Sequence, residues 1–235
     1  MRERSILFNG AMVRAILAGE KTQARRVVKL TIGGHVKELG RHRRWHPDDP
    51  EATLACPYGQ PGDRLWVRET CRFGVHADLW DAVEYKADGA WRKLTDLDEA
   101  TGWRFGELCG YNSAKWRPSI HMPRWASRLL LEVTEVRVER VQDISEADAI
   151  AEGLSESAYH PNPFAALWDS INAKRGYEWA KNPRVWAITF QKLQAEALAL
   201  AEQAPQIAEI VGTRIHVETT RLDTPEHLEA EQEGK

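Results

Sequence analysis

The longest run of alternating apolar and polar residues, residues 128–140, limits what this chain can fold into. Leu129, Leu131 and Val133 recur at every second position, the period of a strand with one buried face. The alternation slips before Val136, so we expect a bend or bulge there. Shorter strand patterns occur elsewhere, with few helical ones between them. The sequence therefore predicts an α+β fold with a barrel-like mixed sheet, and not a parallel α/β sheet.

Further strands are expected from alternation, apolar content and turn chemistry, at residues 27–30, 64–71, 82–86, 90–94 and 185–190. Within the second of these, Leu65, Val67 and Glu69 share one side, and Trp66 and Arg68 share the other. Asp88-Gly89 separates the third from the fourth. Asp-Gly tolerates the positive φ of a type I′ turn, so these two strands should form a hairpin.

A helix is predicted just before a cluster of cations. The apolar residues of 12–17 fall on one helical face, Asn9 or Gly10 can cap its start, and Gly19 suits a left-handed C-terminal cap. Three cations follow beside the partially negative helix end: Lys21, Arg25 and Arg26. A solvated basic loop is the simplest interpretation of such a cluster. The spacing Gly-x-Lys-x-x-x-x-Arg makes a binding role worth testing.

Two later helices are also predicted. Ser145 can cap a helix that runs through Glu152 and is closed by Gly153. Positions i, i+3, i+4 and i+7 of a second helix are apolar: Phe164, Leu167, Trp168 and Ile171. These side chains are expected to pack into the core and not to form a cofactor site.

Charge is distributed unevenly although the net charge is only −3. Residues 1–45 hold 11 Lys/Arg and 3 acids, a balance of +8, while residues 193–235 hold 3 Lys/Arg and 9 acids, a balance of −6. A basic surface that attracts phosphate is therefore expected beside a C-terminal tail that is helical first and acidic later. The 10 Trp residues should mostly pack, although indole faces also stack on bases.

Several classes of protein are not supported. No apolar run approaches the ~20 residues of a membrane helix, and no signal peptide precedes the basic start, so a soluble, cytoplasmic protein is expected. His42, His46, Cys56 and Cys71 lack the close Cys pair of structural zinc sites, so neither a metal nor a cofactor is expected. Phosphate-binding loops, dinucleotide fingerprints and the esterase nucleophile elbow are absent from the sequence.

The pattern of Gly19, Lys21 and Arg26 resembles the signature of the ASCH domain family, small PUA-like β-barrels associated with RNA or modified nucleosides. The Gly62-Asp63 turn before a strand and the later order of strand, helix and closing strand are similar to the family as well. The resemblance spans roughly residues 3–192, with insertions at about 35–60 and 95–118. It also extends to longer, tryptophan-rich ASCH-like proteins often found in phages and prophages. It implies a PUA-like domain at 1–192, with 193–235 as an appended tail.

The resemblance also implies candidate catalytic residues. In family members that are amidohydrolases acting on N4-acetylcytidine, the pattern supplies a Lys as base, a Thr as nucleophile and a Glu as proton donor. Lys21 matches the Lys and Glu152 the Glu, but the Thr position holds Ala24, which has no nucleophilic atom. Thr22 is displaced by about 7 Å on an extended chain, too far for an oriented nucleophile. Lys21 and Glu152 are each expected near the C-terminal end of a short helix. The partial negative charge there should favour Lys21 as a cation and disfavour ionised Glu152, so that Glu152 is a usable proton donor.

Binding of RNA or a modified nucleoside or nucleotide is the leading expectation. The expected contacts fall in two groups, the cationic segment with Lys21, Thr22, Arg25 and Arg26, and the strand residues Trp66, Arg68 and Glu69. Arginines would meet phosphate, Trp66 would stack, and Glu69 could accept from an exocyclic amine. Two alternatives stay open: a hydrolase that removes an acyl group from an N4-acylated cytidine-type nucleoside, and a phage adaptor that binds a host protein through its tail.

Overall fold

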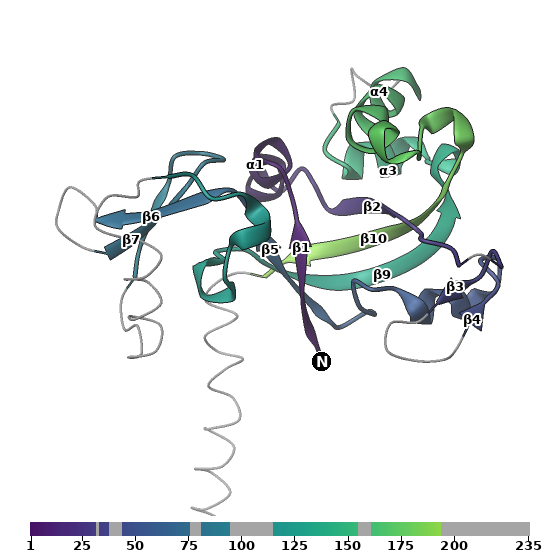
Figure 1. The fold of residues 1–235 in the computed structure, drawn as a ribbon, viewed down its shortest axis with the longest axis horizontal. Helices are drawn as coiled ribbons and strands as arrows, with labels where there is room; N and C mark the ends of the chain where they lie inside the picture. The colour runs from purple at the N-terminus through teal and green to yellow at the C-terminus, as the bar shows by residue number, and fades with distance from the viewer. Residues whose placement is uncertain (32, 38–43, 76–80, 95–114, 155–160, 194–235) are drawn as a thin grey trace, which may run out of the picture. The chain divides into compact units, whose positions relative to one another are not determined.

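The computed structural model describes residues 1–31, 33–37, 44–75, 81–94, 115–154 and 161–193. Its main sheet has five strands in the order β1-β5-β9-β10-β2 (Figure 1). Their bounds are β1 Glu3–Leu7, β5 Arg64–Arg68, β9 Leu130–Arg140, β10 Arg184–Lys192 and β2 Gln23–Val27. β1 and β5 are parallel and the other pairs are antiparallel, so the sheet is mixed, as predicted.

The expected closed barrel is wrong for the strands that the structure describes. β1 and β2 are the two edges of the main sheet and do not pair with each other. The helix α1, Gly10–Ala18, connects them in the chain and packs Val13 and Ile16 into the core. The Arg26 guanidinium reaches across this seam and donates to the Leu7 carbonyl at 2.8 Å. The fold is thus α+β with an open sheet.

The other described strands form two smaller, separate sheets. β6 (Cys71–Val75), β7 (Asp81–Tyr85) and β8 (Trp91–Lys93) form an antiparallel sheet. Gly89, between β7 and β8, has a positive φ of 72°, but Asp88 does not, so the predicted hairpin is present and its predicted type I′ turn is wrong. The strand predicted at 64–71 is instead divided between the main sheet and the sheet of β6, β7 and β8. Near the predicted insertion at 35–60 lie β3 (Val36–Lys37), β4 (Arg44–Trp45) and the 3-10 helix η1 (Pro50–Ala55). Other 3-10 turns are η2 Ser119–His121, η3 Arg124–Ala126, η4 Val141–Asp143, η6 Ala173–Arg175 and η7 Trp179–Lys181.

The predicted irregularity of the long strand is confirmed. Thr189 of β10 lies opposite Glu135, but Phe190 lies opposite Val133, so Thr134 is the extra residue of a bulge. A bulge increases local twist, and β9 and β10 curve together across the sheet (Figure 1). Val133 and Phe190 remain buried on one side of it.

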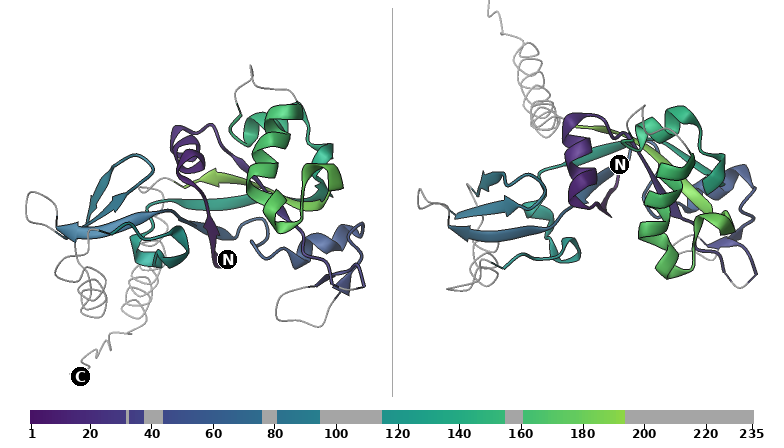
Figure 2. Two further views of the ribbon diagram at one scale, coloured as in Figure 1. Left: turned by 45° about the horizontal axis from the view of Figure 1, so that its top comes forward. Right: turned by 90° about the horizontal axis from the view of Figure 1, so that it is seen from above.

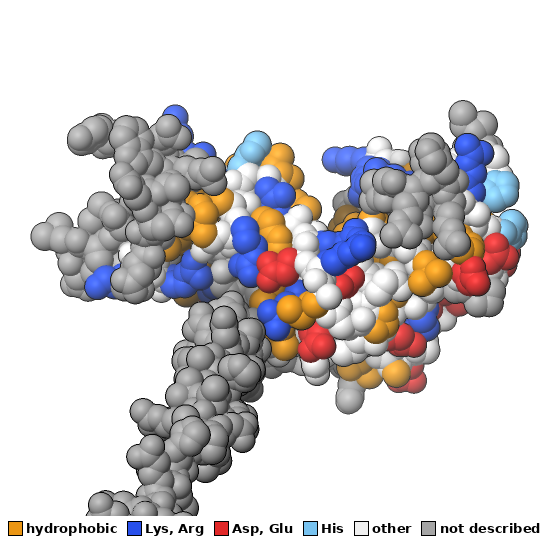
Figure 3. Space-filling view, turned by 90° about the horizontal axis from the view of Figure 1, so that it is seen from below, with side chains coloured by type: hydrophobic (Ala, Val, Ile, Leu, Met, Phe, Trp, Pro, Cys, Tyr) orange, Lys and Arg blue, Asp and Glu red, His pale blue; other side chains and the backbone are white. Residues whose placement is uncertain are grey.

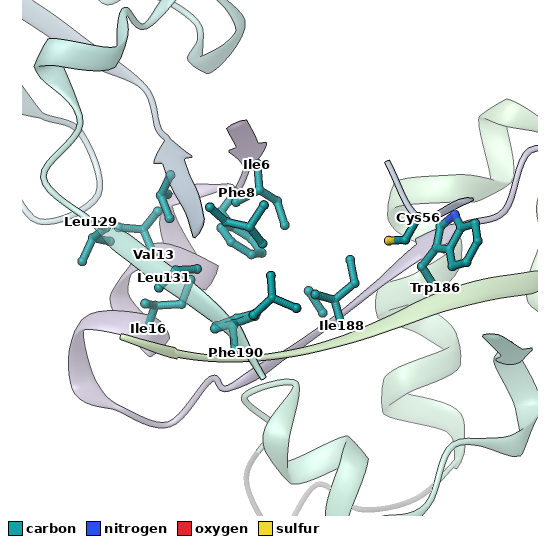
Figure 4. Close-up of a cluster of buried hydrophobic side chains, with 14 of the residues drawn as sticks. Ile6, Phe8, Val13, Ile16, Cys56, Leu129, Leu131, Trp186, Ile188 and Phe190 are labelled. Carbon is teal, nitrogen blue, oxygen red and sulfur yellow. The ribbon is translucent and has the colours of Figure 1, made fainter. Parts of the chain in front are cut away.

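The main core lies between the sheet and α1 (Figure 4). Ile6 and Phe8 meet Val13 and Ile16 there, while Leu131 and the β10 side chains complete it. A second cluster lies on the other face of β2 and β10, where Val27 and Val185 meet Phe164 and Trp168 of α4, Pro161–Asn172. The predicted core role of these two aromatics is confirmed. Ile171 of the same pattern is instead 41% exposed.

The predicted caps are confirmed at both short helices. Asn9 accepts the Met12 N–H at 2.9 Å, and Gly19 adopts φ 81° after α1. Ser145 accepts the Asp148 N–H at 3.1 Å at the start of α3, Glu146–Ala151. The strand predicted at 27–30 is wrong, because β2 ends at Val27 and Leu30 makes only a single bridge to Val36. Among the described helices, none combines the length and apolarity needed to cross a membrane.

The predicted tail, from residue 194 onward, lies outside the described residues, and so does most of the insertion at 95–118. Residues Met1–Lys192 form one compact unit. The division of the chain at residue 192 into a domain and a functional tail stays a prediction.

Candidate functional site

The cationic segment after α1 is a strand and not a solvated loop. β2 pairs with β10 in antiparallel register, with Ala24 opposite Ile188 and Arg26 opposite Trp186. Successive side chains of a strand point to opposite faces, so Ala24 enters the main core while Gln23 and Arg25 lie on the face covered by α3 and α4 (Figure 1). Gln23, Ala24 and Arg25 are all buried.

Lys21 and Glu152 are brought together by a bridge between residues 131 positions apart. The Lys21 Nζ lies 2.5 Å from Glu152 Oε2 and donates to the Glu152 carbonyl at 2.8 Å. Gly153 follows Glu152 with φ 87°, a left-handed conformation that favours glycine, and a Cβ there would lie 3.3 Å from Ala15 Cβ. The predicted pairing of Lys21 and Glu152 is therefore present in the structure.

Burial controls the ammonium group of this pair. Lys21 is only 2% exposed. Desolvation lowers the pKa of Lys21, and the opposing attraction of Glu152 does not restore it. This environment opposes the expectation that the helix end favours Lys21 as a cation. The burial also keeps the amine away from any molecule in solvent.

Arg25 sits at the centre of a buried ionic network. Its guanidinium donates to Glu139 at 2.6 and 3.0 Å, to Asp148 at 3.1 Å and to Gln23 at 2.6 Å. A longer contact of 3.4 Å reaches Glu152 Oε1. Arg137 also pairs with Asp148, at 3.1 Å. Arg25 thus links β2 to β9 and α3, and carboxylates of the protein already neutralise its charge.

This network predicts an acid-sensitive contribution to stability. Burial raises the pKa of Asp148, but the Gln23 hydrogen bond and the charges of Arg25 and Arg137 outweigh burial and hold it at about 2, against an ordinary 3.8. The folded state therefore releases this proton more readily, and about 2 kcal/mol of stability is present above pH 4 and lost as the pH falls toward 2. Asp148→Asn should cost about that amount at pH 7 and almost nothing at pH 2.

Urea unfolding at a series of pH values measures this difference. Glu20→Gln is the control, because Glu20 is an exposed carboxyl with no hydrogen bond or ion pair among the described residues. An Asp148→Asn variant whose loss of stability is the same at pH 2 and pH 7 would contradict the assignment.

A pocket of about 460 Å³ opens at the seam between β1 and β2. α4 lies over β2 and β10 on the face turned away from the main core (Figures 1 and 2). The apolar wall of the pocket comes largely from α4 and includes Phe164, Leu167, Trp168 and Ile171, with Leu7, Met12, Val27 and Tyr58 completing it. Its polar lining is Asn9, Arg25, Arg26, Lys29, Glu152, Asn172 and Arg175.

Only part of the predicted cationic group reaches this pocket. Arg25, Arg26 and Glu152 line it, whereas Lys21 is buried behind Glu152. Thr22 is exposed, and its backbone N–H donates to Ala151 at 2.8 Å, but it does not line the pocket. Arg26 stacks over the Phe8 ring with 5.0 Å between guanidinium carbon and centroid.

The second predicted group lies elsewhere. Trp66, Arg68 and Glu69 do not line the pocket. Arg68 stacks over Trp66 at 5.3 Å and donates to the Ser119 carbonyl at 3.1 Å. Glu69 is 1% exposed and accepts from Arg128 at 2.8 and 2.9 Å, and burial raises its pKa. Their predicted contact with a ligand stays a prediction.

The cysteines and histidines considered as metal ligands can be placed one by one. Cys56 and Cys71 are free and buried, and burial raises their pKa values to about 11 and about 12. His46 is exposed beside Asp48, and His42 lies outside the described residues. The described residues hold no group of three or more His, Cys, Asp or Glu placed to bind a metal.

Several arginines of the basic N-terminal segment are engaged in hydrogen bonds within the protein. Arg4, Arg14 and Arg26 donate to carbonyls of Pro57, Ala87 and Leu7. On the face drawn in Figure 3, Lys and Arg are interspersed with acidic and hydrophobic side chains. The charge excess of residues 1–45 therefore does not translate directly into a phosphate-binding surface.

Sequence reasoning missed several residues of the pocket. Lys29, Arg175, Asn172 and Tyr58 were not expected there, and α4 was expected to supply core only. The helical period identifies which α4 side chains are apolar, but it does not indicate that the same side chains also border a cavity.

Comparisons with known proteins give one likeness of fold. No protein-family model matches the chain, and neither does any curated protein. Among solved structures, the chain is similar to an ASCH domain from Lactobacillus crispatus JV V101. That match has 11% identity and a TM-score of 0.37, and it covers 81% of this chain and 79% of the other. A likeness at this level carries no argument about function, which has to come from the residues of this chain.

Proposed function

We propose that the chain is an ASCH-type, PUA-like domain that binds RNA or a nucleoside-like ligand in the pocket beside β2. One observation carries the proposal: apolar side chains of α4, among them the half-buried Leu167 and the exposed Ile171, line the same pocket as Arg25, Arg26 and Lys29. Nucleotides combine an aromatic base with an anionic backbone, so they match both groups of side chains. The resemblance of Gly19–Arg26 to the ASCH signature points to the same class of ligand.

The dimensions and polar groups of the pocket support this ligand class. About 460 Å³ falls within the range of small-molecule sites. The Asn172 amide donates to the Trp168 carbonyl at 3.2 Å, and among the described residues its oxygen accepts no hydrogen bond. The Asn9 oxygen is used by the helix cap, which leaves its NH₂ group as a donor. An acceptor and a donor can thus read the edge of a base.

A charge placed in the apolar wall tests the proposal. Ile171 lines the pocket and is 41% exposed, so Ile171→Glu should not disturb the core. Its carboxylate would repel phosphate and wet the apolar wall, and we expect at least about tenfold weaker binding, roughly 1.4 kcal/mol. Ile120→Glu is the matched control, because Ile120 is 57% exposed and does not line the pocket.

Binding is measured with ribonucleosides, their monophosphates and short RNAs, first by thermal shift and then by calorimetry. A ligand that binds only the native state raises its melting temperature, and RNA binding should weaken steeply as salt rises. The proposal fails if no member of this panel binds, or if the two glutamate variants lose affinity equally.

The amidohydrolase alternative has less support. Ala24 occupies the nucleophile position and is buried, and Lys21 is only 2% exposed. Water activated by Glu152, which lines the pocket, is the mechanism still compatible with the sequence. We expect no deacetylation of N4-acetylcytidine by the wild-type protein. Turnover that disappears in Glu152→Gln would favour the hydrolase instead.

The adaptor alternative concerns residues 193–235. Under that hypothesis, a chain that ends at residue 192 loses capture of a protein partner but retains ligand binding in the pocket.

A further inference from the structure

Two exposed cations lie at the rim of the pocket and come from separate elements. Lys29 follows the end of β2, and Arg175 ends the 3-10 helix η6 that continues α4. Both side chains are exposed. Within the described residues, neither forms a salt bridge or a hydrogen bond. The rim cations Lys29 and Arg175 therefore differ from the cations deeper in the pocket.

Those deeper cations are already engaged by the protein. Arg25 is surrounded by Glu139, Asp148 and Glu152. Arg26 donates to the carbonyls of Arg25 and Leu7 and lies over the Phe8 ring. A new anion would have to compete with these partners, whereas at the rim cations it meets no described competitor. Solvent-exposed cations also retain the freedom to close on a ligand.

We propose that the rim cations bind a terminal phosphate group, so that the pocket takes a nucleoside monophosphate in preference to the neutral nucleoside. This inference rests on the proposed function and adds a phosphate site to it. The base would lie against the α4 wall, where Leu167 and Ile171 are the more exposed apolar side chains, and the phosphate at the rim.

Charge balance favours a phosphomonoester over the diester of an internal RNA linkage. A monoester carries a charge of about −1.5 to −2 at pH 7, because its second pKa is about 6. Two exposed cations that line the same pocket match that charge. An internal diester carries a single charge, which would leave one rim cation without a partner. A neutral nucleoside would leave both without one.

Calorimetry on the full chain at low salt tests this preference. The probes are the four ribonucleosides, their 5′- and 3′-monophosphates, dinucleoside monophosphates with only a diester, and inorganic phosphate. We expect at least one monophosphate to bind about tenfold or more tightly than its nucleoside, as charge-assisted hydrogen bonds to two cations would provide. In Lys29→Gln/Arg175→Gln this advantage should fall below about threefold. The wild-type advantage should also shrink below pH 6, where the monoester loses its second charge.

The matched control also removes two positive charges, but neither of them at the rim. Lys93 and Lys174 are exposed and do not line the pocket, and Lys174 is the neighbour of Arg175. Lys93→Gln/Lys174→Gln should keep the wild-type advantage for the monophosphate. An equal loss in both double variants would overturn the phosphate site, because it would indicate general attraction by net charge.

The outcomes also separate this inference from the proposed function. If wild-type protein binds nucleosides, or diesters, as tightly as monophosphates, the phosphate site is rejected and the base pocket stands. If nothing in the panel binds, both are rejected. Binding of inorganic phosphate that is unchanged by the rim substitutions would also count against the phosphate site.

Discussion

Glu152→Gln is expected to destabilise the protein by about 3 kcal/mol at pH 7, because it leaves a buried ammonium group without its counter-ion. Lys21 would keep hydrogen-bond acceptors, the backbone carbonyl of residue 152 at 2.8 Å and the glutamine side-chain oxygen, but it would lose the negative charge beside it. Lys21→Met should cost less, since the Glu152 carboxylate retains Arg25 at 3.4 Å. The double variant should lose less than the sum of the single ones, because residues in contact do not contribute independently.

The pH dependence of this variant has a definite sign. Burial lowers the pKa of Lys21 in the folded protein below its ordinary 10.5, and Glu152 is the main group that opposes this. The unfolded chain therefore holds the proton more firmly, and stability rises with pH between the folded pKa and 10.5. The cost of Glu152→Gln should accordingly shrink between pH 7 and pH 10 in urea unfolding experiments. A cost that is constant with pH, or strictly additive single variants, would show that the two groups are not coupled.

Arg128→Met is expected to have an effect of similar size, about 3 kcal/mol, at a site away from the pocket. Arg128 donates to both oxygens of Glu69 and to Asp88 at 2.8 and 3.0 Å, and its guanidinium lies 4.0 Å from the Tyr85 ring centre. Removing it leaves the buried Glu69 carboxyl without its cation. Glu69→Gln should cost less, because Arg128 retains Asp88.

This comparison also tests the predicted ligand role of Glu69. Burial raises the pKa of Glu69 above its ordinary 4.5, so the folded state binds this proton more tightly than the unfolded chain does. The protein therefore loses stability as the pH rises from 4.5 to the folded pKa of Glu69. Glu69→Gln should remove that dependence. If Glu69→Gln weakens nucleotide binding while leaving the unfolding curve unchanged, Glu69 is a ligand residue and not a structural partner of Arg128.

Local features of the fold could be predicted from this sequence because each depends on a few adjacent residues. Asn9 and Gly19 cap the two ends of α1, Gly89 permits the hairpin, and the shift in alternation before Val136 indicates the bulge. Sheet closure depends instead on which edges meet in space. Whether β1 and β2 meet depends on how α1, the nine-residue helix between them in the chain, packs in the folded structure. The helical period of its sequence does not indicate this.

The candidate site was predictable to a smaller extent for a similar reason. The resemblance to the ASCH signature paired Lys21 with Glu152, and their side chains lie in contact. It did not reveal that both would be nearly enclosed, because burial of a cation is decided by elements distant in sequence. Trp66 and Arg68 share a strand face, as alternation requires, but that face does not border the pocket. Lys29 and Arg175 have no local pattern that marks them.

The connection through α1 has a mechanical consequence for the pocket. A helix advances about 1.5 Å per residue, so the nine residues of α1 act as a covalent spacer of roughly 13 Å in the connection between the two edge strands, β1 and β2. One inserted residue would lengthen this spacer and also rotate everything beyond it by about 100°. Met12 on the cavity side and Ile16 on the interior side could not both return to their places. Length variation in homologous chains should therefore accumulate in the loops and spare this segment.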